Sequence, residues 1–191
     1  MEVRPGANPA DVKNYDTDRL RHDFLIQNLF VADEIKTIYS QIDRIIVGAA
    51  TPVNKELVLE AGAELRAKYF LERREMGIIN IGGNGTVTVD GKEYNFKYKD
   101  GMYIGMGAKD ISFKSEDPKN PAKFYLNSAP AHTRLSSILT VHQHIRHTQQ
   151  YLLIQLRTFY LRIKRNLDVL RVLTIEQSIS ISFQDRLKAA S

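Results

Sequence analysis

Between residues 42 and 130 the sequence is a succession of short apolar runs that turn residues interrupt. The runs are rich in β-branched and aromatic residues, and clusters of Gly, Pro, Asn and Asp separate them, which is the pattern of antiparallel strands. In "TVTVDGKEYNF", Asp90 and Gly91 supply the positive φ angles of a tight hairpin turn. We therefore predict a mainly β protein, with a small antiparallel sandwich or barrel over residues 42–130.

A short amphipathic helix is predicted ahead of this region, in "YDTDRLRHDFLIQNLF". Leu20, Phe24 and Leu25 recur at helical spacing, and the Asp-Thr-Asp sequence at positions 16–18 offers residues that can cap the first turn. The expected order is thus one short helix followed by strands.

The composition changes abruptly at Thr133. All 11 glycines and all 6 prolines precede that residue. Residues 1–132 carry 18 Lys/Arg and 19 Asp/Glu, whereas residues 133–191 carry 9 and 3, so the excess positive charge lies in the last 59 residues. A tail without turn residues is a different kind of sequence from the body. We divide the chain into a β-sandwich domain at 1–132 and a basic tail at 133–191.

The tail has several interpretations. Apolar residues recur at steps of four and three from Leu152 to Leu170, while Arg157, Lys164 and Arg171 recur every seven residues, which is typical of a basic amphipathic helix. Such a helical C-terminal extension can pack on the body or on another subunit. A contact with a membrane or with nucleic acid is a weaker interpretation. We favour a shifted reading frame, which produces an abrupt change of this kind.

Composition excludes several classes of function. There is no cysteine, so disulfides, thiolate metal sites and cysteine nucleophiles are ruled out. The opening "MEVRPGANPADVKNYD" lacks the apolar core of a signal peptide. No window reaches the roughly 18 uninterrupted apolar residues of a spanning helix. We expect a cytoplasmic protein with neither a membrane nor a nucleic-acid partner.

Two glycine clusters, "IGGNGTV" at 81–87 and "GMGAKD" at 105–110, raise the question of a phosphate-binding loop. Such a loop works by leading into the N-terminus of a helix, whose amides converge on the anion. Each cluster here leads into a predicted strand instead. The glycines are therefore interpreted as tight-turn residues.

The charged run "YFLERREMG" contains the candidate substrate-binding residues, Arg73 and Arg74. The planar guanidinium fork of arginine matches the geometry of a carboxylate, so either residue could grip an acidic substrate. Ion pairs at a solvated strand entry are the alternative. The body offers only His22 and His132 as imidazoles, so no histidine pair that could bind a metal is expected there.

Long blocks of the body resemble a known family. "YSQIDRIIVGAATPVN", "YFLERREMGIINIGGNGTVTVDGKEY" and "DPKNPAKFYLNSAPAH" are similar to the N-terminal half of the 5-keto-4-deoxyuronate isomerases, also called 4-deoxy-L-threo-5-hexosulose-uronate ketol-isomerases. The resemblance runs from Met1 to about Thr133. It implies a cupin-like antiparallel β-sandwich, an oligomer, and an aldose–ketose isomerisation of a uronate in pectin catabolism, with 3-deoxy-D-glycero-2,5-hexodiulosonate as product.

The resemblance also implies zinc, held in the C-terminal half of the family by a His-x-His pair, a following glutamate and a later histidine. In "VHQHIRHTQQ", His142, His144 and His147 bring three imidazoles together. On a strand His147 would point away from the other two, and on a helix His142 would lie nearly opposite. The stretch directly after them, "TQQYLLIQLRTF", contains no glutamate, and the nearest acidic residues downstream are Asp168 and Glu176. We do not expect these histidines to form a zinc site, and we expect this chain not to bind the metal.

The sequence therefore predicts a ketol-isomerase chain that lacks the half supplying the metal ligands, and we expect it to be inactive by itself. The catalytic base stays unassigned. The alternative prediction is a non-catalytic β-sandwich module that binds a sugar acid or a partner chain, with the basic tail as an interaction element.

Overall fold

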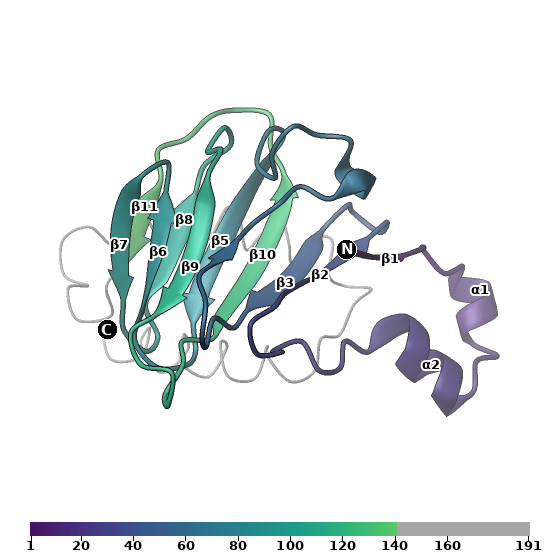
Figure 1. The fold of residues 1–191 in the computed structure, drawn as a ribbon. Helices are drawn as coiled ribbons and strands as arrows, with labels where there is room; N and C mark the ends of the chain where they lie inside the picture. The colour runs from purple at the N-terminus through teal and green to yellow at the C-terminus, as the bar shows by residue number, and fades with distance from the viewer. Residues whose placement is uncertain (141–191) are drawn as a thin grey trace, which may run out of the picture.

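Residues 1–140 are described by the computed structural model, and their strands form two β-sheets (Figure 1). The larger sheet has seven strands, in the order β1 (Glu2–Arg4), β2 (Ile35–Ser40), β3 (Ile46–Ala50), β10 (Phe124–Pro130), β5 (Arg74–Asn80), β8 (Gly101–Ile104) and β11 (Ile138–Thr140). The smaller sheet has four, in the order β4 (Leu57–Val58), β9 (Ile111–Ser115), β6 (Gly85–Val89) and β7 (Lys92–Phe96). Every paired strand is antiparallel to its neighbour except β1, which runs parallel to β2. The predicted mainly β, antiparallel architecture is confirmed.

Turn chemistry explains the hairpin between β6 and β7. Asp90 and Gly91 have φ angles of 48° and 81°, and Val89 pairs directly with Lys92. A two-residue loop with positive φ at both positions matches the twist of the strands on either side. The hairpin prediction is confirmed at the residues that the sequence indicated.

The N-terminal helix also forms where it was predicted. Helix α2 (Thr17–Phe24) begins after Asp16, whose Oδ1 accepts a 2.8 Å hydrogen bond from the backbone N–H of Arg19. This contact satisfies one of the free N–H groups of the first turn. A one-turn helix, α1 (Pro9–Val12), precedes it, and a 3-10 turn, η1 (Ala63–Leu65), lies between β4 and β5. No helix within the described part of the chain is long and apolar enough to cross a membrane.

The sheet begins earlier than the predicted start at residue 42. Strand β2 occupies residues 35–40, and β1 pairs with it from the N-terminus. No glycine or proline marks the boundary of β2 in the sequence. Asp33 provides the turn instead, with a φ of 58°.

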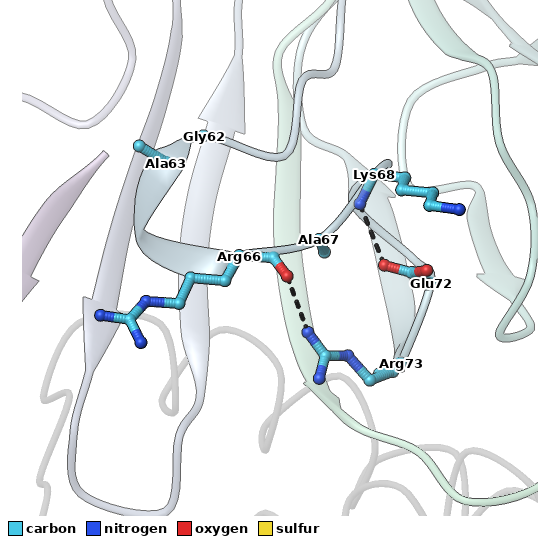
Figure 2. A pocket seen from close by; sticks show the side chains of 7 residues that line it. All are labelled: Gly62, Ala63, Arg66, Ala67, Lys68, Glu72 and Arg73. Carbon is cyan, nitrogen blue, oxygen red and sulfur yellow. Dashed lines mark hydrogen bonds between the residues drawn. The ribbon is translucent and has the colours of Figure 1, made fainter.

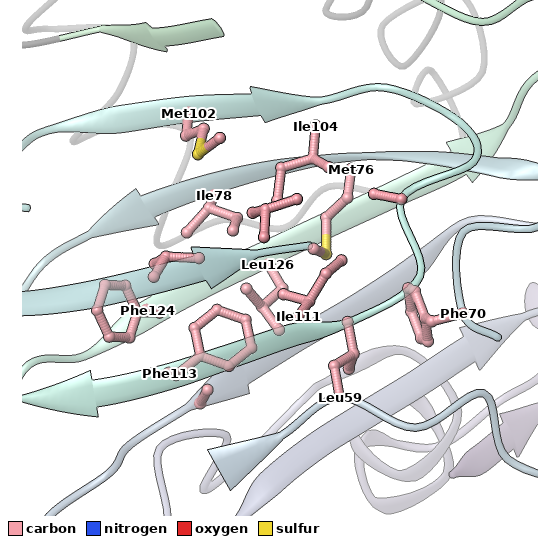
Figure 3. Close-up of a cluster of buried hydrophobic side chains, with 14 of the residues drawn as sticks. Leu59, Phe70, Met76, Ile78, Met102, Ile104, Ile111, Phe113, Phe124 and Leu126 are labelled. Atoms are coloured by element: carbon pink, nitrogen blue, oxygen red, sulfur yellow. The ribbon is translucent and has the colours of Figure 1, made fainter. Parts of the chain in front are cut away.

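The core lies between the two sheets. Alternate residues of the central strands point inward, so that Met76 and Ile78 of β5 meet Phe113 of β9 and Phe124 of β10 (Figure 3). The rings of Phe113 and Phe124 lie 5.3 Å apart between centroids. Large apolar side chains fill this space, and the sandwich interior is consequently a packed core.

The second glycine cluster contains a turn with a φ of 103° at Gly107, as interpreted from the sequence, whereas the first is a bend at Gly82 and Gly83 without positive φ angles and continues as strand from Gly85. The first leads into β6 and the second into β9, and neither precedes a helix. At Gly83 an added Cβ atom would overlap the backbone oxygen of Asn120. Only a residue without a side chain allows the two backbones to approach this closely.

The seventh strand of the large sheet, β11, lies beyond Thr133, where the composition changes. It pairs with β8 through Ile138 and Tyr103. The boundary at residue 132 stays a prediction. The predicted helical extension and the histidines at 142, 144 and 147 lie outside the described residues.

Candidate anion-binding site

The two predicted substrate-binding arginines are neighbours in sequence, but the structure does not bring them together. Arg74 begins β5 and is buried, with 7% of its surface exposed, whereas Arg73 precedes the strand and is exposed. Adjacent residues of an extended chain point to opposite sides. The two guanidinium groups therefore face different surroundings.

Arg74 is held by backbone and hydroxyl oxygens. Its Nε donates to Ser128 Oγ at 3.1 Å, and its Nη2 donates to the backbone oxygens of Ser128 at 2.9 Å and Arg44 at 2.6 Å. The guanidinium carbon lies 5.8 Å from the centre of the Tyr39 ring. Burial lowers the pKa of Arg74 to about 10, so the group is still charged at neutral pH. These contacts tie β5 to β10 and to the β2–β3 turn.

Arg73 lies at the edge of an open hollow of about 480 Å³. Figure 2 shows the residues that line it, which lie between the start of η1 and the start of β5; they are Gly62, Ala63, Arg66, Ala67, Lys68, Glu72 and Arg73. Arg73 Nη2 donates to the backbone oxygen of Arg66 at 3.0 Å. Three cationic side chains and one carboxylate thus surround the hollow, which makes it attractive to anions.

Sequence reasoning missed a buried polar pair on strands β5 and β8. The hydroxyl of Tyr103 donates to Glu75 Oε2 at 2.8 Å, and the two residues are 2% and 4% exposed. Glu75 had been placed in a solvated charged run. Alternation along the strand gave no signal for its burial, because it places Glu75 on the face opposite the inward-facing Met76.

The part of the chain that the structure describes has only two histidines that could act as metal ligands. His22 is exposed on α2 and its Nδ1 lies 2.7 Å from Asp23 Oδ1, while His132 is exposed near the end of β10. Residues 1–140 contain no group of three or more His, Asp or Glu side chains that could hold a metal ion. The donor set of a zinc site is not found among them.

The two-sheet antiparallel sandwich makes this a mainly β domain. Comparison of the sequence with known families identifies its family. The model of the KduI/IolB family matches residues 24–150. The chain belongs to the KduI/IolB family.

Curated relatives support this membership. The chain is 74% identical over 132 residues to the 4-deoxy-L-threo-5-hexosulose-uronate ketol-isomerase of Lachnospira eligens, an alignment that covers 69% of this chain and 47% of the relative. It is 68% identical over 139 residues to the protein of the same name from Lachnoclostridium phytofermentans, covering 73% and 50%. The chain thus spans about half the length of the curated relatives it matches. A solved cupin domain, that of Schizosaccharomyces pombe Cnp3, overlays 50% of this chain and 63% of its own at 16% identity, with a TM-score of 0.38.

Proposed function

We propose that this chain functions in the ketol-isomerisation of 4-deoxy-L-threo-5-hexosulose uronate to 3-deoxy-D-glycero-2,5-hexodiulosonate, a step of pectin breakdown. The observation that carries the proposal is the 74% identity over 132 residues to a protein named for that reaction. The proposed setting is the cytoplasm and the proposed assembly is a homo-oligomer, without a membrane or nucleic-acid partner.

Residues 1–140 serve in this proposal as the scaffold of the enzyme. Large apolar side chains fill the space between the sheets, so a polar sugar acid finds neither room nor partners there. A divalent metal assists such an isomerisation by polarising a carbonyl and stabilising the enediolate. Residues 1–140 contain no group of side chains that could hold a zinc ion. We therefore assign no catalytic step to these residues.

An isomerase assay on the 191-residue chain tests this division of roles. The substrate is 4-deoxy-L-threo-5-hexosulose uronate, with and without added zinc, and the Lachnospira eligens enzyme is the positive control. A matched variant carries His142→Ala, His144→Ala and His147→Ala. We expect neither the unmodified chain nor the triple variant to show turnover. Turnover in the triple variant comparable to the control would contradict the scaffold role.

A second candidate function is that of a non-catalytic module for sugar acids. The hollow beside Arg73 favours it, because cationic side chains outnumber carboxylates there. In a direct binding measurement this module would retain a sugar acid without converting it.

A further inference from the structure

We propose that the hollow lined by Arg66, Lys68 and Arg73 binds the carboxylate of a small sugar acid. The carboxylate chemistry follows from the charges of the hollow, whereas the choice of a sugar acid rests on the proposed function. The site lies outside the packed core.

The local charge favours an anion. Arg66, Lys68 and Arg73 supply three cations around the hollow, and within residues 1–140 none of them forms a salt bridge. Glu72 is the one acidic side chain of the lining, and its Oε2 accepts a 2.9 Å hydrogen bond from the backbone N–H of Lys68. The positive charges are thus not neutralised by a carboxylate of the described chain. An incoming anion gains from all three.

Arg73 is positioned in advance for an anion. Its Nη2 donates to the backbone oxygens of Arg66 at 3.0 Å and Leu65 at 3.4 Å. These contacts fix the guanidinium while using one of its three nitrogens. The N–H groups of Nε and Nη1 remain to donate to an incoming carboxylate, each through a single charge-assisted hydrogen bond, because both bidentate geometries of the fork use Nη2. Fixing the side chain beforehand lowers the entropy lost on binding.

The backbone of the same segment is held in an uncommon conformation. Arg66 has a φ of 46° in the left-handed region, and its carbonyl is the acceptor that Arg73 uses. A non-glycine residue in this region costs free energy, and such residues cluster at ligand sites. Figure 2 shows the side chains of Arg66 and Lys68 extending from this segment in opposite directions. Both are exposed, so each can turn toward an anion held by Arg73.

The volume agrees with a small ligand. About 480 Å³ is within the range of small-molecule sites. The hollow is open to solvent, so affinity is expected to fall as salt is added and screens the charges.

Isothermal titration calorimetry of the 191-residue chain tests the site. The probes are D-galacturonate, D-galactose as its neutral counterpart, and inorganic phosphate. We expect galacturonate to bind and galactose not to bind. Arg73→Gln should weaken galacturonate binding by about tenfold or more, since a charge-assisted contact is lost. Lys119→Gln, at an exposed lysine that does not line the hollow, should leave the affinity unchanged.

A second variant, Lys68→Gln, and a second anion, phosphate, complete the test. Lys68→Gln removes a side chain that makes no hydrogen bond within residues 1–140, so it reports on the site if Arg73→Gln unfolds. The proposal would be overturned if the unmodified chain did not bind galacturonate, or if the Arg73 and Lys68 variants both bound it as tightly as the unmodified chain. Phosphate binding as tight as that of galacturonate would overturn the choice of a sugar acid. Isomerase turnover is not part of this readout, so a failure here is distinct from a failure of the proposed function.

Discussion

The guanidinium of Arg74 donates a 2.6 Å hydrogen bond to the backbone oxygen of Arg44, and Arg44 has a φ of 54°. Asp43 beside it has a φ of 56°. Two consecutive non-glycine residues with positive φ are strained. The buried arginine supports this turn from a strand 30 positions further along the sequence.

Replacing Arg74 should therefore loosen the β2–β3 turn as well as β5. We expect Arg74→Met to lower the free energy of unfolding by about 2–4 kcal/mol, because the oxygens of Ser128 and Arg44 lose their donors. Urea denaturation measures the change. Arg73→Met, at the exposed neighbour, is the control and should cost less than about 1 kcal/mol. Equal losses in the two variants would contradict the different environments of the arginines.

A single buried amide should be equally important at the other end of β5. Asn80 Nδ2 donates to the oxygens of Gly83 and Lys97, and its Oδ1 accepts from the N–H groups of Gly82 and Lys123. We expect Asn80→Ala to destabilise the fold by about 3 kcal/mol, since buried partners are left without hydrogen bonds. Asn95→Ala on β7 is the exposed control. Similar midpoints of urea denaturation for the two variants would refute this role.

Acid should destabilise the domain partly through Asp33. Its carboxylate accepts hydrogen bonds from the backbone and side chain of Asn54 and from the backbone N–H of Val53, which lower its pKa from 3.8 to about 2. A pKa lowered on folding stabilises the folded state above about pH 4, and this stabilisation is lost as the pH falls towards 2. Asp33→Asn should thus lower the melting temperature at pH 7.

The same variant gives the pH test. The difference in melting temperature between the unmodified chain and Asp33→Asn should shrink between pH 4 and pH 2. Glu93→Gln, at an exposed residue of β7, serves as the control. A difference that stays constant across this range would show that protonation of Asp33 does not contribute.

The attachment of β11 depends on a glycine of the second cluster. A Cβ atom at Gly105 would overlap the backbone oxygen of Leu135, and the N–H of Gly105 donates to Ser137 Oγ at 3.3 Å. We expect Gly105→Ala to detach residues 134–140 from β8 and to speed hydrogen exchange of the β8 amides. Gly101→Ala on β8 is the matched control, because its nearest neighbour would be 3.4 Å from the added atom. Unchanged exchange in Gly105→Ala would contradict the contact.

Local signals predicted much of the fold. The Asp90-Gly91 turn and the Asp16 cap are encoded by neighbouring residues, so the sequence indicates them directly. Strand β2 was missed because its boundary is set by Asp33, whose conformation depends on hydrogen bonds to residues some 20 positions away. The parallel pairing of β1 with β2 likewise depends on distant residues.

The candidate site was only partly predictable, for a related reason. Arg73 and Arg74 belong to one charged run, and only the three-dimensional structure separates an exposed guanidinium from a buried one. Arg66 and Lys68 line the hollow because the chain turns at Arg66, whose backbone is left-handed. The sequence did not indicate this turn. The family, in contrast, follows from long blocks of sequence.

The most direct test of the scaffold role is the turnover of a chimera. Residues 1–132 of this chain replace the matching residues of the Lachnospira eligens ketol-isomerase, and kcat/KM for 4-deoxy-L-threo-5-hexosulose uronate is measured against the parent enzyme. We predict a value within about threefold of the parent, because a scaffold that keeps its packing leaves the transition state unchanged. A folded chimera whose kcat/KM falls by more than about a hundredfold would contradict the account.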